Sequence, residues 1–221
     1  MEIILFILGI IVVVYAQSHI MKTYHETMRI RNEKMLSGQE VARKILDANG
    51  LEDIYVVQVS GELTDHYDPS RNVIRLSNHV FQDDSIASLA VAAHECGHVI
   101  QRKEGYLFYR LRSALVPVVN LVSYFGYFVI IISAFAGITA YLLLGMVMLL
   151  STLIFQLVTL PVEIDASKRG MEEIERLNLA KQEEMTNVSN MLKAAAMTYV
   201  ASLASTILNL LRLIFMYRDR D

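Results

Sequence analysis

"SALVPVVNLVSYFGYFVIIISAFAGITAYLLLGMVMLLSTLIFQLVTLPV", residues 113–162, contains no Asp, Glu, Lys or Arg. A membrane-spanning helix needs about 20 mainly apolar residues, so this run is long enough to cross a bilayer twice. Small residues and a glycine interrupt the bulky side chains at Ser133–Gly137, which favours a turn there. We therefore predict a transmembrane hairpin over residues 113–160.

A second apolar segment precedes it, since no charged residue occurs between Glu2 and Lys22. This segment lacks the basic residues that precede a cleavable secretory signal, so we predict an uncleaved membrane anchor over residues 1–21. Cleavage after Ala16, at a weak small-residue site, stays an alternative. Hydrophobic residues make up 54% of the chain and its mean hydropathy is +0.38, which together indicate a membrane protein.

A third apolar segment, residues 194–217, differs from the others because polar side chains recur in it at three- and four-residue steps. These are Thr198, Ser202, Ser205, Asn209 and Arg212. A helix with one polar face either packs against other helices in the membrane or lies along its surface. The pattern does not decide between these two arrangements.

Basic residues follow the first predicted span, precede the second and follow the third. They are Lys22, Arg29, Arg31 and Lys34, then Arg102, Lys103, Arg110 and Arg112, then Lys168 and Arg169. Because Lys and Arg accumulate on the cytoplasmic side of spans, we predict that these flanks lie in the cytoplasm. The net charge of −3 argues against a nucleic-acid surface, and the single Cys96 excludes an intramolecular disulfide.

The polar segment between anchor and hairpin, residues 22–112, predicts a small α+β domain. Ser37 and Glu40 have capping-box spacing, and Gly50 suits the end of the helix that they begin. β-branched runs from Ile54 and from Asn72 predict two strands. A further helix, capped by Asp83 or Asp84, is expected to continue to about Gly105. Residues 90–101, "AVAAHECGHVIQ", lie within this helix.

His94 and His98 are four residues apart, so on a helix they face the same side and can reach one metal ion. Glu95 lies next to that face and can move protons without holding the metal. His-Glu-x-x-His is therefore a candidate zinc-hydrolase motif. An apolar helix accommodates such polar groups only when they gain partners, which weighs against a chance match.

A catalytic zinc takes three protein ligands, so one more residue is needed. A third histidine at position 104 would complete one known pattern, but Glu104 stands there. The other pattern, the gluzincin type, uses a glutamate from a later helix, and Glu163 follows the hairpin directly. We predict Glu163 as the third ligand on a helix that begins at Pro161, with Asp165 and Glu104 as rivals.

Residues 161–193 are thus expected to carry the third ligand, and within them a Glu- and Lys-rich helix over Met171–Glu184 is expected to be solvated. Cys96 is a small residue off the histidine face, and we expect it to pack in the core.

The motifs "TDHYDPSRNVIRLS", "AAHECGHVIQ" and "LPVEIDASKRG", separated by an uncharged hairpin, resemble those of the bacterial YugP-type neutral zinc metallopeptidases. The resemblance covers nearly the whole chain and implies Zn2+ as cofactor, His94, His98 and Glu163 as ligands, and Glu95 as catalytic base. Related membrane proteases carry an aspartate four residues after the ligand glutamate. Ser167 stands at that position here, so Ser167 or Asp165 is the candidate to support a ligand.

We therefore expect a mainly α-helical membrane protein with a zincin-like domain that faces the cytoplasm of a bacterial cell. It would cleave peptide bonds of proteins, mainly membrane proteins, near the inner membrane surface. The segment His66–Asp68 is expected either to form an edge strand beside the cleft or to be a simple turn. A catalytically silent zinc-binding membrane adaptor is the alternative function, and the intact Glu95 argues against it.

Overall fold

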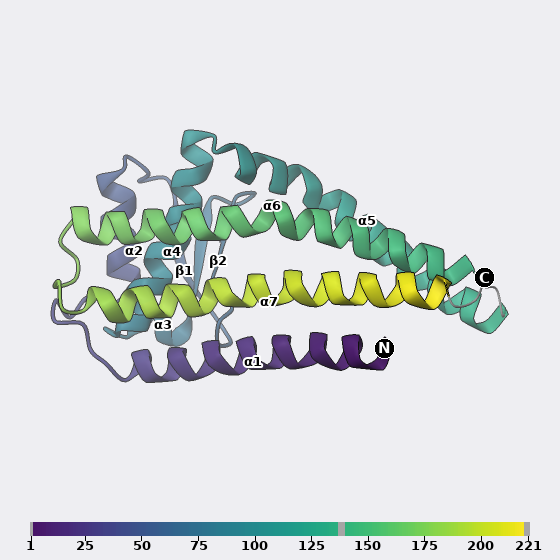
Figure 1. Ribbon diagram of the computed structural model, residues 1–221. Helices are drawn as coiled ribbons and strands as arrows, with labels where there is room; N and C mark the ends of the chain where they lie inside the picture. Colours follow the sequence, from purple (N-terminus) through teal and green to yellow (C-terminus); the bar gives the residue numbers. More distant parts are fainter. Residues whose placement is uncertain (1, 137–139, 219–221) are drawn as a thin grey trace.

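Four long helices dominate the fold in a computed structural model, which describes residues 2–136 and 140–218. They are α1 (Glu2–Met28), α5 (Leu107–Ala136), α6 (Ala140–Arg176) and α7 (Met185–Arg218). α7 contacts both α1 and α6, and α6 contacts α5, so the helices form a row in the order α1, α7, α6, α5. All four extend away from a small domain, and the two chain ends lie at the far end of the row (Figure 1).

Among the described residues, three helical segments are long and apolar enough to cross a membrane: Glu2–Met28, Leu144–Arg176 and Met185–Met216. The last of these includes the segment with the polar face. The predicted turn at Ser133–Gly137 is wrong in part, because α5 stays helical through Ala136, while Gly137 lies outside the described residues. Within α5, the side chains of residues 123 and 126–136 also lie outside the described part of the chain.

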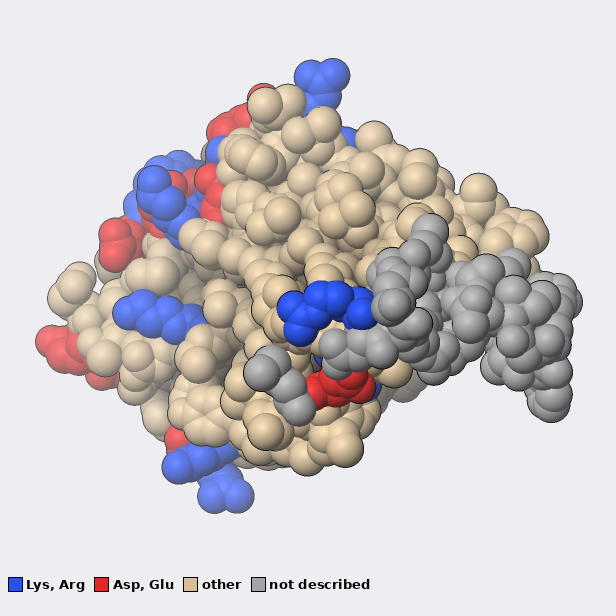
Figure 2. Space-filling view, turned by 45° about the vertical axis from the view of Figure 1, so that its right-hand side comes forward, with Lys and Arg blue, Asp and Glu red and all other residues tan. Residues whose placement is uncertain are grey.

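Charged side chains gather over the small domain, and the helices beyond it present mostly uncharged surface (Figure 2). The domain consists of α2 (Gly38–Ala48), β1 (Tyr55–Val59), β2 (His66–Asp68), β3 (Val73–Ser77), α3 (Asn78–Gln82) and α4 (Ile86–Glu104). β1 pairs with β3 in parallel, and β2 pairs with β3 in antiparallel orientation. The strand order is β1-β3-β2, so β2 lies at an edge of the sheet.

Local sequence signals set most of the domain's helix ends. Ser37 and Glu40 form the predicted capping box of α2, and Gly50 and Gly105 adopt the left-handed conformation after α2 and α4. The prediction of Asp83 or Asp84 as cap of α4 is wrong. Ser85 is the cap, and its hydroxyl accepts a hydrogen bond from the backbone N–H of Ser88.

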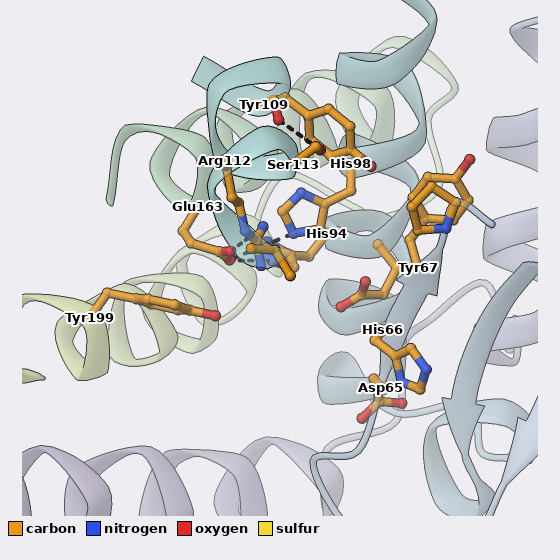
Figure 3. Close-up of a pocket in the computed structure, with 13 residues that line it drawn as sticks. Asp65, His66, Tyr67, His94, His98, Tyr109, Arg112, Ser113, Glu163 and Tyr199 are labelled. Carbon is orange, nitrogen blue, oxygen red and sulfur yellow. Dashed lines mark hydrogen bonds and ion pairs between the residues drawn. The ribbon is translucent and has the colours of Figure 1, made fainter. Parts of the chain in front are cut away.

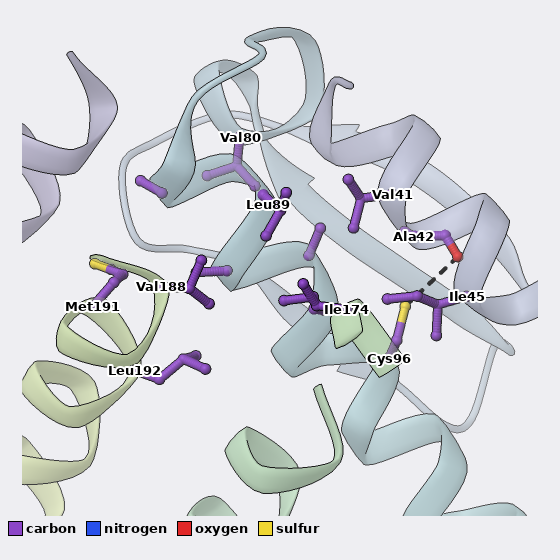
Figure 4. Close-up of a cluster of buried hydrophobic side chains, with 14 of the residues drawn as sticks. Val41, Ala42, Ile45, Val80, Leu89, Cys96, Ile174, Val188, Met191 and Leu192 are labelled. Atoms are coloured by element: carbon purple, nitrogen blue, oxygen red, sulfur yellow. Dashed lines mark hydrogen bonds between the residues drawn. The ribbon is translucent and has the colours of Figure 1, made fainter. Parts of the chain in front are cut away.

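The hydrophobic core is shared between the domain and the long helices. Val41 and Ile45 of α2 pack with Leu89 and Cys96 of α4, and Ile174 of α6 joins them (Figure 4). Cys96 is fully buried, as expected for a packing residue. α1, α6 and α7 complete this core, so the domain and these three long helices share one hydrophobic cluster.

Two predicted boundaries are wrong because α6 runs through them. α6 continues through Pro161 to Arg176, so the ligand-bearing segment does not begin a new helix. Proline is tolerated there because loss of one backbone hydrogen bond costs less than ending a helix in apolar surroundings. The segment Met171–Glu184 is the end of α6 and a connection, with Leu179 and Glu184 buried instead of solvated. α1 contains the residues predicted as the membrane anchor and continues to Met28.

Candidate metal and active site

His94 and His98 project from one face of α4 toward Glu163 of α6 (Figure 3). The Nε2 atoms of His94 and His98 lie 3.3 Å and 3.6 Å from Glu163 Oε2. One potential ligand atom from each of the three residues lies within 4.8 Å of the others. Among the described residues, these form the group of His, Cys, Asp and Glu side chains arranged to hold a metal ion.

Glycine residues let α4 and α6 approach closely enough to form this group. A Cβ atom added to Gly97 would lie 2.3 Å from the carbonyl oxygen of Ala166, and one added to Gly170 would lie 2.8 Å from that of Ala93. Both distances are shorter than a carbon–oxygen contact permits. The absence of side chains at these two positions therefore brings Glu163 to the two histidines.

The two rival carboxylates lie elsewhere. Arg169 binds Asp165 Oδ2 through Nε at 2.6 Å and forms an ion pair with Glu104. Neither carboxylate joins the histidine group. The structure thus brings together His94, His98 and Glu163, the three residues predicted as ligands, and holds the two rival carboxylates outside this group.

A hydrogen-bond chain fixes the orientation of His98. The Gln101 side-chain amide donates to the carbonyl oxygen of Val162 and to Asp165 Oδ2, both at 2.8 Å. Its oxygen is therefore left to accept from His98 Nδ1, which is 3.1 Å away. A proton on Nδ1 leaves the Nε2 lone pair free and directed at Glu163, as metal binding requires. Asp165 thus supports a ligand through Gln101, a role that the sequence did not indicate for Gln101.

Ser167 occupies the corresponding position beside the other histidine. Its hydroxyl lies 3.1 Å from Nδ1 of His94. Ser167 therefore contacts His94, a candidate ligand. Ser167 was one of the two residues predicted to support a ligand.

Glu95 is 6% exposed and, like His94, lines two cavities beside the metal group, the first of which His98 also lines. Burial raises the pKa of its carboxyl group to about 7, although nearby His94 favours the charged form. The backbone N–H of Tyr67 in β2 also faces this carboxylate. Glu95 is therefore close to the metal group without belonging to it.

Arg112 and Tyr199 were missed as site residues. Arg112 Nη1 of α5 lies 2.9 Å from Glu163 Oε1, an ion pair that leaves Oε2 directed at the histidines. Tyr199 of α7 points toward the cluster and lines both neighbouring cavities (Figure 3). Arg112 stood out in the sequence only as a basic flank, and Tyr199 lay in an apolar segment. Only the packing of α5 and α7 against α6 brings them to the site.

Two cavities meet at the cluster and share Asp65, His94, Glu95, Glu163 and Tyr199. The first, about 380 Å³, lies between β2 and α5. The second, about 270 Å³, lies between α1 and α7. Together they form space on both sides of the three candidate ligands.

The segment His66–Asp68 combines both structures considered for it. It is an edge strand, and His66 and Tyr67 line the first cavity. Asp68 turns away and accepts hydrogen bonds from the backbone N–H and hydroxyl of Ser70. Two of the three residues therefore face the site.

Two histidines, one carboxylate and open space on either side match the ligand set of a catalytic zinc, which keeps one position open. Hydrogen bonds to Nδ1 of both histidines complete the match. The donor set therefore fits zinc.

Comparison with known proteins agrees with a zinc site. Residues 2–218 match the model of a family described as "Putative neutral zinc metallopeptidase". The chain is 37% identical over 203 residues to a Bacillus subtilis (strain 168) protein named "Putative membrane protease YugP", covering 92% of this chain and 90% of that protein. No solved structure matches the chain. The chain belongs to this neutral zinc metallopeptidase family.

Proposed function

We propose that this protein is a membrane-embedded, zinc-dependent endopeptidase that cleaves proteins at or near the cytoplasmic membrane surface. The observation that carries the proposal is the convergence of His94, His98 and Glu163 beside the buried Glu95. A structural zinc site needs no proton-transfer group and is closed by a fourth ligand, whereas this group has a carboxylate and open space beside it. These features favour a zincin-like catalytic site over a silent adaptor.

His94, His98 and Glu163 would hold the ion. When bound there, zinc supplies a Lewis acid that polarises a peptide carbonyl and makes water acidic enough to attack it near neutral pH. Glu95 accepts a proton from the attacking water and passes it to the leaving nitrogen. Arg112 holds the carboxylate of Glu163 through Oε1, and Gln101 holds the ring of His98.

The edge strand supports binding of an extended peptide beside Glu95. β2 is paired on one side only, by β3, and Tyr67 on it faces the site. A peptide chain laid along such an edge forms main-chain hydrogen bonds that do not depend on its sequence. This arrangement suits a protease with many substrates.

The position of the site at the junction of domain and helix row supports substrates close to the membrane. Glu163 lies in a candidate span, and His94 lies in the domain. The basic flanks of the spans support a domain that faces the cytoplasm. A Ser60→Cys label should then be inaccessible from outside intact cells, and an Ala136→Cys label accessible; labelling of Ser60→Cys from outside would overturn the orientation.

The enzymatic proposal is tested with purified full-length protein, loaded with zinc in lipid nanodiscs and incubated with casein. Glu95→Gln should retain about one zinc per chain and lose hydrolysis, because Glu95 moves protons and holds no metal. His94→Ala should lose both the bound zinc and hydrolysis. Undiminished hydrolysis by Glu95→Gln would remove Glu95 from the mechanism, and an inactive wild-type protein with full zinc would favour the adaptor.

A further inference from the structure

Apolar side chains from three helices and a loop line much of the cavity between α1 and α7. Ile20 of α1, Val91 of α4 and Leu63, which precedes β2, contribute apolar side chains. Met191 and Leu192 of α7 add two more. We propose that this cavity binds one large apolar side chain of the substrate, such as leucine or phenylalanine, next to the bond that is cleaved. The inference rests on the proposed protease function and deepens it.

The cavity between α1 and α7 adjoins the metal group, and this position indicates that a substrate side chain occupies it. His94, Glu95 and Glu163 form one wall of this cavity as well as the catalytic group. A peptide bond placed at that group would therefore direct a neighbouring side chain into the space between α1 and α7. The volume of about 270 Å³ lies below the usual range for small-molecule pockets, which suits one side chain.

Two alanines of α7 provide the room. Leu192, Ala195 and Tyr199 follow each other at helical steps of three and four residues, so they share a face, and Ala196 lies beside them. A larger side chain at Ala195 would project into the cavity. Size selection therefore depends on α7, far from the motif in the sequence.

The first cavity, on the other side of the cluster, combines polar and apolar side chains, among them His66 and Arg112 together with Tyr109 and Val116. The peptide test therefore examines both sides of the cleaved bond.

The cleavage test uses zinc-loaded full-length protein in nanodiscs and peptides of alanine and serine with a single variable residue. Peptides with leucine or phenylalanine should be cleaved next to that residue at least about 10-fold more efficiently than those with alanine or aspartate. Ala195→Leu should abolish this preference, and Leu63→Ala should shift it toward larger residues. Val200→Leu is the matched control, because Val200 lies on the same helix, is 49% exposed and does not line the cavity.

Binding of the same labelled peptides to zinc-loaded Glu95→Gln protein, measured by fluorescence anisotropy, separates the two proposals. The leucine peptide should bind at least about 10-fold more tightly than the alanine peptide, and the added Ala195→Leu change should remove the difference. Binding with this preference but no cleavage by wild-type protein would support the cavity and overturn the protease function. Cleavage with no apolar preference, or with a preference that neither Ala195→Leu nor Leu63→Ala alters, would overturn the cavity alone. Neither binding nor cleavage would overturn both.

Discussion

The contact between α4 and α6 differs from the contact between α1 and α7 in what separates the two backbones. At Gly97 and Gly170 the first pair of helices meets backbone to backbone. The second pair meets through side chains, as where Gly9 of α1 faces the hydroxyl of Ser205 on α7. Side chains can change rotamer, whereas a backbone contact can yield only if a helix shifts.

This difference follows the chemistry that each contact carries. The α4–α6 contact carries all three candidate ligands, whose positions must hold to within a few tenths of an ångström for metal binding. The α1–α7 contact borders the second cavity, which on our proposal receives substrate side chains of several sizes. A rigid contact would therefore suit the metal group, and an adjustable one would suit the proposed substrate selection.

The largest expected effect comes from removing the ligand that α6 contributes. Glu163→Ala should lower zinc affinity by more than about 100-fold, beyond the loss typical for residues that only support a ligand. Zinc titration with a competing chelator measures this, with Glu104→Ala as control because Glu104 pairs with Arg169. Equal loss in both variants would remove Glu163 from the site.

Gly97→Ala tests the backbone contact directly. The added methyl group would meet the Ala166 carbonyl oxygen, so we expect a loss of about 1–3 kcal/mol in the free energy of unfolding and weaker zinc binding. Gly9→Ala is the matched change in the other contact. Its methyl group would lie 3.1 Å from a hydroxyl that can rotate, and the better helix propensity of alanine offsets the crowding.

Thermal unfolding and zinc titration of both variants measure these effects. Gly9→Ala should change stability by less than about 1 kcal/mol and leave zinc affinity unchanged. A Gly97→Ala protein as stable and as zinc-avid as Gly9→Ala would end the distinction between the two contacts.

Local sequence signals predicted only part of the fold. The capping box of Ser37, the glycine at the end of α4 and the histidine pair each depend on a few neighbouring residues, so they can be read from the sequence. α3 was not predicted, and β2 was expected only as one of two alternatives for residues 66–68, because a three-residue strand exists only through pairing with β3. The continuous α6 was missed because proline is common in the first turn of a helix, so Pro161 was predicted to begin a new one.

The residues of the candidate site likewise include some that the sequence predicts and others that only the fold reveals. Glu163 was predicted from its place after the hairpin, and the packing of Gly97 on Ala166 explains how it reaches the histidines. Gln101, Arg112 and Tyr199 act through contacts between helices far apart in the sequence. No spacing rule identifies such residues without the fold.

Gln101→Leu should have an intermediate effect. Leucine cannot accept a hydrogen bond from His98 Nδ1–H, so the ring loses its fixed orientation, and zinc affinity should fall about 10- to 100-fold. Gln101→Glu keeps an acceptor and should bind zinc more tightly than Gln101→Leu. If the leucine variant bound zinc as well as the wild-type protein, the hydrogen bonds that link Asp165 to His98 through Gln101 would have no part in metal binding.

The smallest effect is expected far from both helix contacts, at the start of α2. The Ser37 hydroxyl accepts a hydrogen bond from the backbone N–H of Glu40 at 3.3 Å, and Glu40 Oε2 accepts one from the backbone N–H of Ser37 at 2.8 Å. Ser37→Ala removes the first of these bonds, so the free energy of unfolding should fall by about 1 kcal/mol. Zinc affinity of the folded protein should not change, because α2 contributes no ligand. This variant therefore separates a general loss of stability from damage to the site. If its zinc affinity fell as far as that of Gly97→Ala, zinc binding would follow overall stability, and the close approach of α4 and α6 would have no special role.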